Sequence, residues 1–394
     1  MAKRACETRW HESASVALLA LVCAGVALPA AASAQWDGSV SSSLRMHGGD
    51  ALAGSAHGEV DLSVRARATW QWDDRRQSLT VEPFLRLDLL ADGRSRLDFR
   101  DLSWTRAWNR WALVVGSREV FWGTAESRHL IDEINQREPT ATIRGYDKLA
   151  QPMLSAKAFM DWGVLEAFLL PFFRPRPFHG RSGRLSSPLP VADETAVFEA
   201  GSGRFHPDLA ARWSHSLRAW DAGLAFFYGN GRDPRLEQSG DTVWIPHYDV
   251  VNRTMIDVQW TASRWLVKAE AVTRGSALSR YSAAVGGVEF APRDFASVFL
   301  EYSYDSRGTE ATTAQENDVY VGGRLLTQDG SLQSGLFVDR YSGAALATAE
   351  ARWRFGADIV LSVEARRFWG EASEQPPRAP HQESFLAIAA ERHF

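Results

Sequence analysis

Apolar and polar residues alternate strictly between Glu59 and Gln71, and this pattern constrains the fold more than any other feature of the chain. The apolar set consists of Val60, Leu62, Val64, Ala66, Ala68 and Trp70. A period of two is that of a β-strand, because successive side chains of a strand point to opposite faces. More than about ten residues with one unbroken apolar face is long for a soluble β-sandwich and typical of a strand that crosses a membrane.

The same alternation recurs along the chain and predicts about eighteen strands, with about sixteen as the alternative if one pair is misread. The expected strand centres lie near residues 43, 65, 84, 101, 116, 154, 167, 211, 224, 255, 269, 285, 299, 323, 335, 350, 363 and 388. The fold class that follows is all-β: a transmembrane antiparallel up-and-down β-barrel, in which one strand face meets lipid and the other meets water.

The gaps between these strands support the same fold independently. Tight turns are expected after every even-numbered strand, near Asp73, Trp108, Asp161, Leu217, Ser263, Pro292, Asp329 and Gly356. Long gaps follow odd-numbered strands only, near 48–58, 122–148, 173–206, 230–249, 305–317 and 369–381. A barrel with both ends on one side of the membrane has short turns on that side and long loops on the other.

The N-terminus predicts a secretory signal peptide. Basic residues at its start precede an apolar run over 16–28, and Ala32-Ser33-Ala34 offers the small residues that a signal peptidase requires. We therefore expect residues 1–34 to be a signal peptide, and residues 35–394 to be the barrel. Both cysteines, Cys6 and Cys23, fall in the signal, so the mature chain would hold no disulfide and no cysteine-bound metal.

The composition excludes some partners. The full chain carries a net charge of −4, and the signal carries three basic and two acidic residues, a net of +1, which leaves −5 for the mature chain. This mild acidity argues against a nucleic-acid partner. The sixteen tryptophans fit residues at the headgroup layer of a membrane, although sugar-binding β-proteins are also rich in tryptophan.

The two ends and the long third gap together resemble the bacterial outer-membrane porins, barrels of sixteen to eighteen strands. The residues that carry the resemblance are Ala34, the terminal Glu391-Arg392-His393-Phe394, and Gly116-Ser117-Arg118 followed by Trp122-Gly123. It implies an outer-membrane location among lipid and lipopolysaccharide, recognition of Phe394 by the barrel-insertion machinery, and passage of small hydrophilic solutes. It leaves a homotrimer open. Arg392 departs from the pattern, since that position is commonly aromatic or apolar in the family.

The gap over 122–148 is the segment in which we expect a pore constriction. Residues 125–136 read as a short helix with Leu130, Ile131 and Ile134 near one face, which could pack on the inner wall. The polar residues expected to face water in the constriction are Arg128, Asp132, Glu133 and Glu138. The alternative is an external cap that never enters the lumen.

A set of arginines on neighbouring strands predicts a basic ladder in the lumen, formed by Arg65, Arg67, Arg86, Arg96 and Arg100. Opposite the acids of the long loop, such a ladder would create a transverse field that orients dipolar solutes. The alternative is that acids on the same strands, namely Asp61, Glu82, Asp88 and Asp98, neutralise the arginines in ordinary ion pairs.

The expected function is therefore passive diffusion through a channel, with no cofactor, no metal site and no catalytic residue. His129 and Glu133 stand four residues apart, but they lack a third ligand nearby and do not form a zinc motif. Three alternatives stay open at this stage: a barrel enzyme such as a hydrolase, a secreted soluble protein that acts on carbohydrate, and a structural barrel with a sealed lumen.

Fractionation separates the soluble alternative from the barrel. We expect the mature chain to stay with the outer membrane through a high-salt wash, because its strands would be embedded in hydrocarbon. Recovery of the folded chain in the soluble fraction, without detergent, would contradict the barrel.

Overall fold

The structure is a computed structural model that describes residues 33–48, 58–91, 93–141, 147–180, 189–308, 311, 317–370 and 384–394. The predicted signal peptide lies outside this part, apart from its last two residues, which belong to the first strand. These described residues form twenty-one strands, and eighteen of the strands form one sheet. No helix in the described ranges is long and apolar enough to cross a membrane.

The eighteen strands of the large sheet have the following bounds: β1 Ser33–His47, β2 Gly58–Trp72, β3 Gln77–Asp88, β4 Arg96–Ala107, β5 Trp111–Arg118, β6 Gln151–Met160, β7 Gly163–Leu170, β9 Asp208–Leu217, β10 Trp220–Asn230, β13 Val250–Ala262, β14 Trp265–Gly275, β15 Arg280–Arg293, β16 Ala296–Asp305, β17 Asp318–Leu326, β18 Gly330–Asp339, β19 Ala345–Phe355, β20 Ile359–Trp369 and β21 Phe385–His393. Each of the eighteen predicted centres falls inside one of these strands, so the predicted count of eighteen is confirmed.

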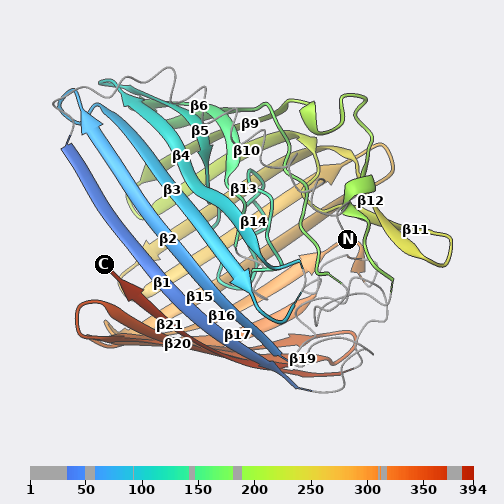
Figure 1. Cartoon of the computed structure of the whole chain (residues 1–394). Helices are drawn as coiled ribbons and strands as arrows, with labels where there is room; N and C mark the ends of the chain where they lie inside the picture. The colour runs from blue at the N-terminus through green and yellow to red at the C-terminus, as the bar shows by residue number, and fades with distance from the viewer. Residues whose placement is uncertain are drawn as a thin grey trace.

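The sheet closes into a barrel because every strand pairs antiparallel with its neighbour in the chain and β21 pairs with β1. Figure 1 shows the tilted ring of strands, with the last strand, β21, beside β1. The end of the chain completes the seam, since the backbone N–H groups of Gly38 and Phe394 each donate to the other residue's carbonyl at 3.0 Å. Closure leaves no open sheet edge, so no backbone N–H or C=O group of an edge strand would face the hydrocarbon of a membrane unpaired.

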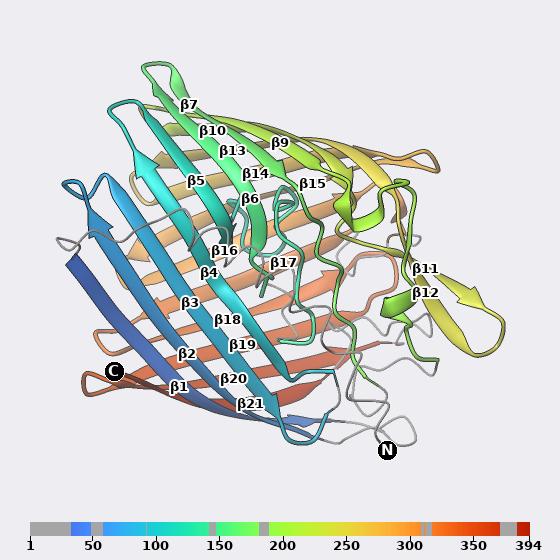
Figure 2. The ribbon, with the colours of Figure 1, turned by 45° about the horizontal axis from the view of Figure 1, so that its top comes forward.

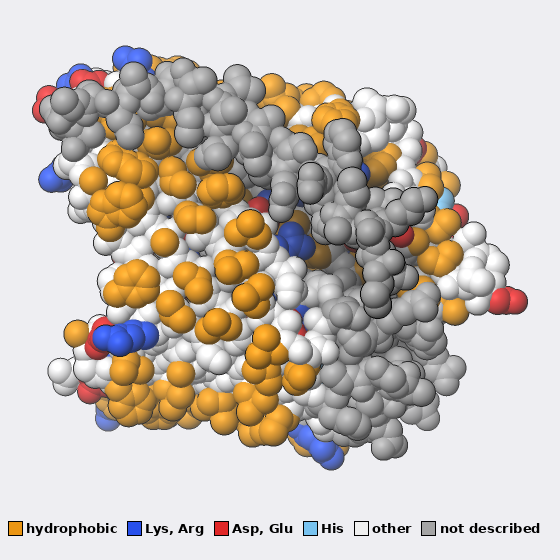
Figure 3. Space-filling model, in the orientation of Figure 1, with side chains coloured by type: hydrophobic (Ala, Val, Ile, Leu, Met, Phe, Trp, Pro, Cys, Tyr) orange, Lys and Arg blue, Asp and Glu red, His pale blue; other side chains and the backbone are white. Residues whose placement is uncertain are grey.

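The two faces of each strand differ in polarity. On β16 the outward residues Val298, Leu300 and Tyr302 are exposed, whereas the inward residues Glu301 and Asp305 are buried. The space-filling view shows apolar side chains over the outer face of β1 to β4, with charged side chains near the rims (Figure 3). The predicted alternation of lipid-facing and lumen-facing residues is therefore confirmed.

Exposed aromatic residues form two bands on the outside of the barrel. Near the short turns lie Trp108, Trp111, Trp162, Trp220, Trp265, Trp353 and Phe355. Near the long loops lie Tyr228, Tyr304 and Trp369. Tryptophan and tyrosine prefer the headgroup layer, because their rings are apolar and their N–H and O–H groups are polar, so the two bands fit the two edges of a membrane.

The parity of the connections is as the sequence predicts. Counted around the ring, a short turn follows every even-numbered strand. These turns join β2 to β3, β4 to β5, β6 to β7, β9 to β10, β13 to β14, β15 to β16, β17 to β18 and β19 to β20, and the long loops lie at the opposite end. The sequence did not predict a small second sheet built from the long loops. It contains β8 (Val197–Phe198), β11 (Arg235–Ser239) and β12 (Val243–Tyr248), with β11 and β12 forming the hairpin at the right of Figure 1.

Adjacent residues of β1 offer a direct test of the two faces. Val40 points outward at mid-strand with 39 % of its surface exposed, and Ser41 points into a lumen cavity. We expect Val40→Arg to lower the free energy of unfolding by about 2–4 kcal/mol, because a charge then faces hydrocarbon. The control Ser41→Arg places the same charge in the lumen and should change it little. Urea unfolding in lipid vesicles measures both, and equal losses would contradict the assigned faces.

Candidate functional site in the barrel lumen

The long loop that joins β5 to β6, residues 119–150, is called the inner loop below. Its side chains and backbone contact lumen-facing residues of β3, β4, β13, β14, β16 and β17, so the loop lies inside the ring of strands (Figure 2). It is irregular: the short helix predicted over 125–136 is not formed, and this prediction was wrong.

Wall carboxylates bind six backbone N–H groups of this segment, and two of them, those of Leu130 and Ile131, would be needed inside a helix over 125–136 but donate to Glu270 at 2.7 and 3.4 Å. Glu270 of β14 accepts N–H bonds from Thr124 and Ala125 at 2.5 and 2.9 Å. Glu301 of β16 accepts from the N–H groups of residues 126 and 127 at 2.8 and 2.7 Å. A periodic apolar pattern cannot reveal this competition, because the acceptors come from strands more than 140 residues away.

The apolar residues of the inner loop pack on an apolar part of the inner wall. Leu130, Ile131 and Ile134 are 5 %, 0 % and 1 % exposed. They form one cluster with inward residues of β6, β7, β9, β10, β13, β14 and β15, among them Met153, Phe168, Phe227, Met255, Val272 and Val285. This half of the lumen is therefore filled by side chains.

The three acids of the predicted constriction do not point into water as expected. Asp132 pairs with Lys148 at 2.5 Å and Glu133 pairs with Arg253 of β13. Glu138 is 1 % exposed and receives guanidinium groups from β3 and β4. A carboxylate withdrawn from water needs a partner, and the wall supplies one for each. Whether these residues narrow a passage stays a prediction.

The tip of the inner loop is held by charges of the opposite wall. Glu126 binds Lys268 of β14 at 2.8 Å and Arg324 of β17 at 2.6 Å. Burial disfavours its ionised form, but these two cations outweigh burial and lower the pKa of Glu126. Arg128, the basic residue of the predicted constriction, is also buried and binds Asp305 at 3.2 Å.

The predicted basic ladder divides into two groups. Arg86, Arg96 and Arg100 approach Glu138 at 2.5, 3.0 and 3.8 Å, so they clamp the returning leg of the inner loop. Arg65 and Arg67 lie nearer the turns, with side chains 43 % and 46 % exposed and only distant contacts to carboxylates, at 3.5 Å or more. Acids of the same strands, the alternative considered from the sequence, contact members of both groups: Glu82 lies near Arg65 and Arg67, and Asp98 lies 3.6 Å from Arg96. The first group also binds Glu138, which belongs to the inner loop.

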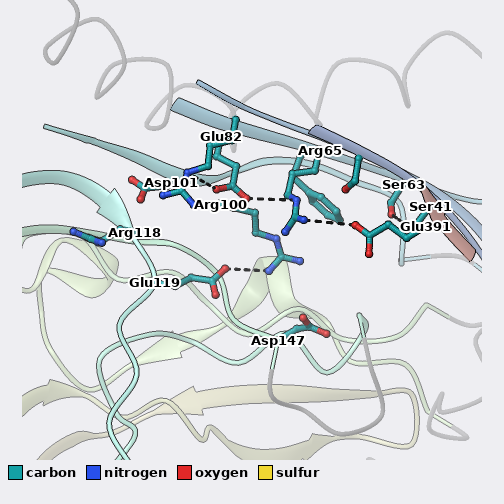
Figure 4. Close-up of a pocket in the computed structure, with 13 residues that line it drawn as sticks. Ser41, Ser63, Arg65, Glu82, Arg100, Asp101, Arg118, Glu119, Asp147 and Glu391 are labelled. Atoms are coloured by element: carbon teal, nitrogen blue, oxygen red, sulfur yellow. Dashed lines mark hydrogen bonds and ion pairs between the residues drawn. The ribbon is translucent and has the colours of Figure 1, made fainter. Parts of the chain in front are cut away.

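A cavity of about 440 Å³ remains on the other side of the lumen (Figure 4). It is lined by β1 to β5, by β21 and by both ends of the inner loop: Ser39, Ser41, Ser63, Arg65, Arg67, Glu82, Phe84, Arg100, Asp101, Arg118, Glu119, Asp147 and Glu391. Arg65 reaches toward Glu391 at 3.5 Å, and Arg100 binds Glu119 at 3.1 Å. The sequence reasoning did not single out Arg118, Glu119, Asp147 or Glu391 as lining residues, because loop ends and the last strand acquire this role only on closure of the ring.

The inner loop spans the lumen between two facing walls. Going round the ring from β4 through β5, β6, β7, β9, β10, β13, β14 and β15 to β16 takes nine steps, half of eighteen. Contacts at β4 come from Glu138 and contacts at β16 come from the loop tip. The loop thus separates an apolar, filled compartment from a polar, open one.

One glycine lets the inner loop leave β5 at the required angle. Gly116 has φ +140°, and a Cβ atom there would stand 2.1 Å from the carbonyl oxygen of Leu102. Any other residue would force the two backbones apart. Gly116 therefore sets the direction in which Arg118 and Glu119 enter the cavity.

His129 has a structural role in the inner loop. Its ring packs edge-on against Phe121 with centroids 4.9 Å apart, and burial lowers the pKa of His129 to about 4, so the ring is neutral at pH 7. Within the described ranges, no group of three His, Cys, Asp or Glu side chains could hold a metal ion.

Similarity to known proteins is confined to solved structures. No family model and no curated protein matches the sequence. Two engineered variants of the porin of Rhodopseudomonas blastica are similar in structure, each at 11 % identity, with TM-scores of 0.47 and 0.48, over 92 % of this chain and 100 % of theirs. Nothing about solute or mechanism follows from similarity at this level. The closed antiparallel ring of eighteen strands is itself a porin-like barrel.

The buried pair between the inner loop and β13 gives a measurable prediction. In Arg253→Met the carboxylate of Glu133 stays buried without its cation, so we expect a loss of about 3–5 kcal/mol in the free energy of unfolding. The double variant Arg253→Met with Glu133→Leu removes both charges and should recover most of that loss. Urea unfolding followed by tryptophan fluorescence measures the cycle, and additive losses would show that the pair does not act as a unit.

Proposed function

We propose that this protein is an outer-membrane channel through which small hydrophilic solutes diffuse passively, and that the passage runs through the open compartment beside the inner loop. The observation that carries the proposal is the contrast between the two halves of the lumen. One half is packed with apolar side chains. The other holds a charged cavity of about 440 Å³.

The outer surface supports a membrane location for this channel. Lipid-compatible side chains cover the strands, and aromatic residues gather at both ends of the barrel, as in proteins of the bacterial outer membrane. The mature chain would then contact outer-membrane lipid and lipopolysaccharide, with its long loops facing outward. Diffusion through an open channel needs no cofactor and no energy source.

The charges of the cavity favour dipolar solutes. Arg65 and Arg67 stand on the barrel wall, whereas Glu119 and Asp147 belong to the inner loop. Fixed charges of opposite sign on two sides of a narrow passage produce a transverse field, which orients a solute that carries both signs. We propose that these two loop acids and the two ladder arginines act together in this way.

Planar-bilayer recording tests the proposal. Purified protein should give stepwise currents. Replacing both ladder arginines, Arg65→Gln with Arg67→Gln, should shift the reversal potential in a salt gradient toward cation selectivity. A unit charge about 8 Å from the ion path in water contributes roughly 0.5 kcal/mol, so each arginine removed should raise the permeability of a monovalent cation about two-fold and lower that of an anion by a similar factor.

The matched control is Arg110→Gln, at an exposed turn where Arg110 pairs with Asp161 outside the cavity. This variant should keep the selectivity of the wild type. A folded wild-type barrel that passes no current would overturn the proposed function, and an unchanged reversal potential in the double variant would remove the two arginines from the passage.

A further inference from the structure

Two buried carboxylates of the barrel wall hold the inner loop through its backbone. We propose that Glu270 and Glu301 are positioning residues that fix this loop across the lumen and thereby set the width of the passage. This inference rests on the proposed function, because it assigns to the wall the control of a channel that the loop would border.

The bonds of Glu270 are unusually numerous. One carboxylate oxygen accepts from the N–H groups of Thr124 and Ala125, and the other accepts from those of Leu130 and Ile131 at 2.7 and 3.4 Å. Glu270 is 1 % exposed, so its charge is met by these donors rather than by water. Bonds from N–H groups to a charged acceptor are about twice as strong as neutral ones.

Glu301 binds the next two residues of the loop in the same way. Its two oxygens accept from the N–H groups of Glu126 and Ser127, and it is 2 % exposed. Six backbone N–H groups between residues 124 and 131 therefore end on two side chains. Without these acceptors the N–H groups would be buried and unpaired, which costs free energy for each group.

A glycine allows the close approach. Gly123 has φ +154°, and a Cβ atom there would meet the Oε1 atom of Glu270 at 3.2 Å and the Nδ1 atom of His129 at 3.1 Å. The residue before the bound segment is thus shaped for a carboxylate at this point of the wall. The apolar cluster alone could slide, since dispersion contacts have little directional preference, whereas hydrogen bonds fix the register of the loop.

The link to the passage is geometric. Glu119 and Asp147, near the two ends of the inner loop, line the open cavity. If the segment 124–131 left the wall, these ends would lose the support that holds them beside the barrel arginines. We expect the released loop to fluctuate and the aperture to widen.

The variant Glu270→Gln tests the inference. The glutamine amide keeps one acceptor oxygen but points an NH₂ group at two backbone N–H groups, so two of four bonds are lost. We expect at least about a tenfold rise in the fraction of released loops. In single-channel recordings this should appear as added conductance levels above that of the wild type, and Glu270→Gln with Glu301→Gln should increase them further.

Asp257→Asn is the matched control. Asp257 is a buried inward acid directly opposite Glu270 on β13, and it binds Arg212 instead of the loop. Its replacement should leave the conductance levels of the wild type unchanged. If Glu270→Gln forms a folded barrel, judged by heat-dependent gel mobility, and its conductance levels match those of the wild type, the inference is overturned.

Trypsin gives a readout that does not depend on conduction. Arg128 is 8 % exposed in the held loop, so the wild type should resist cleavage after this residue. Glu270→Gln should be cut there and Asp257→Asn should not. A wild-type barrel without current would overturn the proposed function alone, while equal resistance of Glu270→Gln and the wild type would overturn the positioning role.

Discussion

Every buried backbone N–H group needs a hydrogen-bond acceptor, and this requirement determines the structure of both the barrel wall and the inner loop. In the wall the acceptors are carbonyl groups of the next strand, and the ring must close so that no strand is left over. In the lumen the inner loop has no neighbouring strand over residues 124–131, and the wall offers the carboxylates of Glu270 and Glu301 instead. The same constraint thus produces regular structure in one place and prevents it in another.

Charged side chains also connect the loop and the wall. The backbone N–H groups of the loop offset the cost of burying the charge of Glu270, and cations of the wall do so for acids of the loop. Lys268 lies on the same strand as Glu270 and binds Glu126, so loop and wall share one network of charges. On the facing wall Glu138 performs the reverse role, since a loop acid is held there by arginines of β3 and β4. Acids of the loop therefore bind cations at both walls, and at the wall of β14 and β16 the carboxylates of Glu270 and Glu301 also bind the loop backbone.

Sequence patterns predict the parts of this molecule in which local and global preferences agree. A lipid-facing strand must be apolar at every second residue, whatever lies inside, so all eighteen strands and the parity of their connections could be read from the chain. The inner loop escaped prediction because its conformation depends on acceptors far away in sequence. The alternation did place Lys268 and Glu270 on the polar face of a strand, but nothing local distinguishes a carboxylate that faces water from one that binds a loop. The short strands β8, β11 and β12 were missed for a similar reason, since two distant loops must meet before β8 and β12 can pair.

The off-centre position of the open cavity follows from how the inner loop packs its apolar side chains. Leu130, Ile131 and Ile134 must be covered, and a wall with residues such as Met255 and Val272 covers them without admitting water. Filling that half directs any hydrated path to β1 to β5 and β21, where serines and half-exposed arginines replace aliphatic side chains. The apolar cluster determines which half of the lumen the inner loop fills, and the carboxylates fix the position of the loop along the wall. Changes to the cluster should therefore alter the stability of the barrel before its selectivity, and changes to the carboxylates should alter the aperture first.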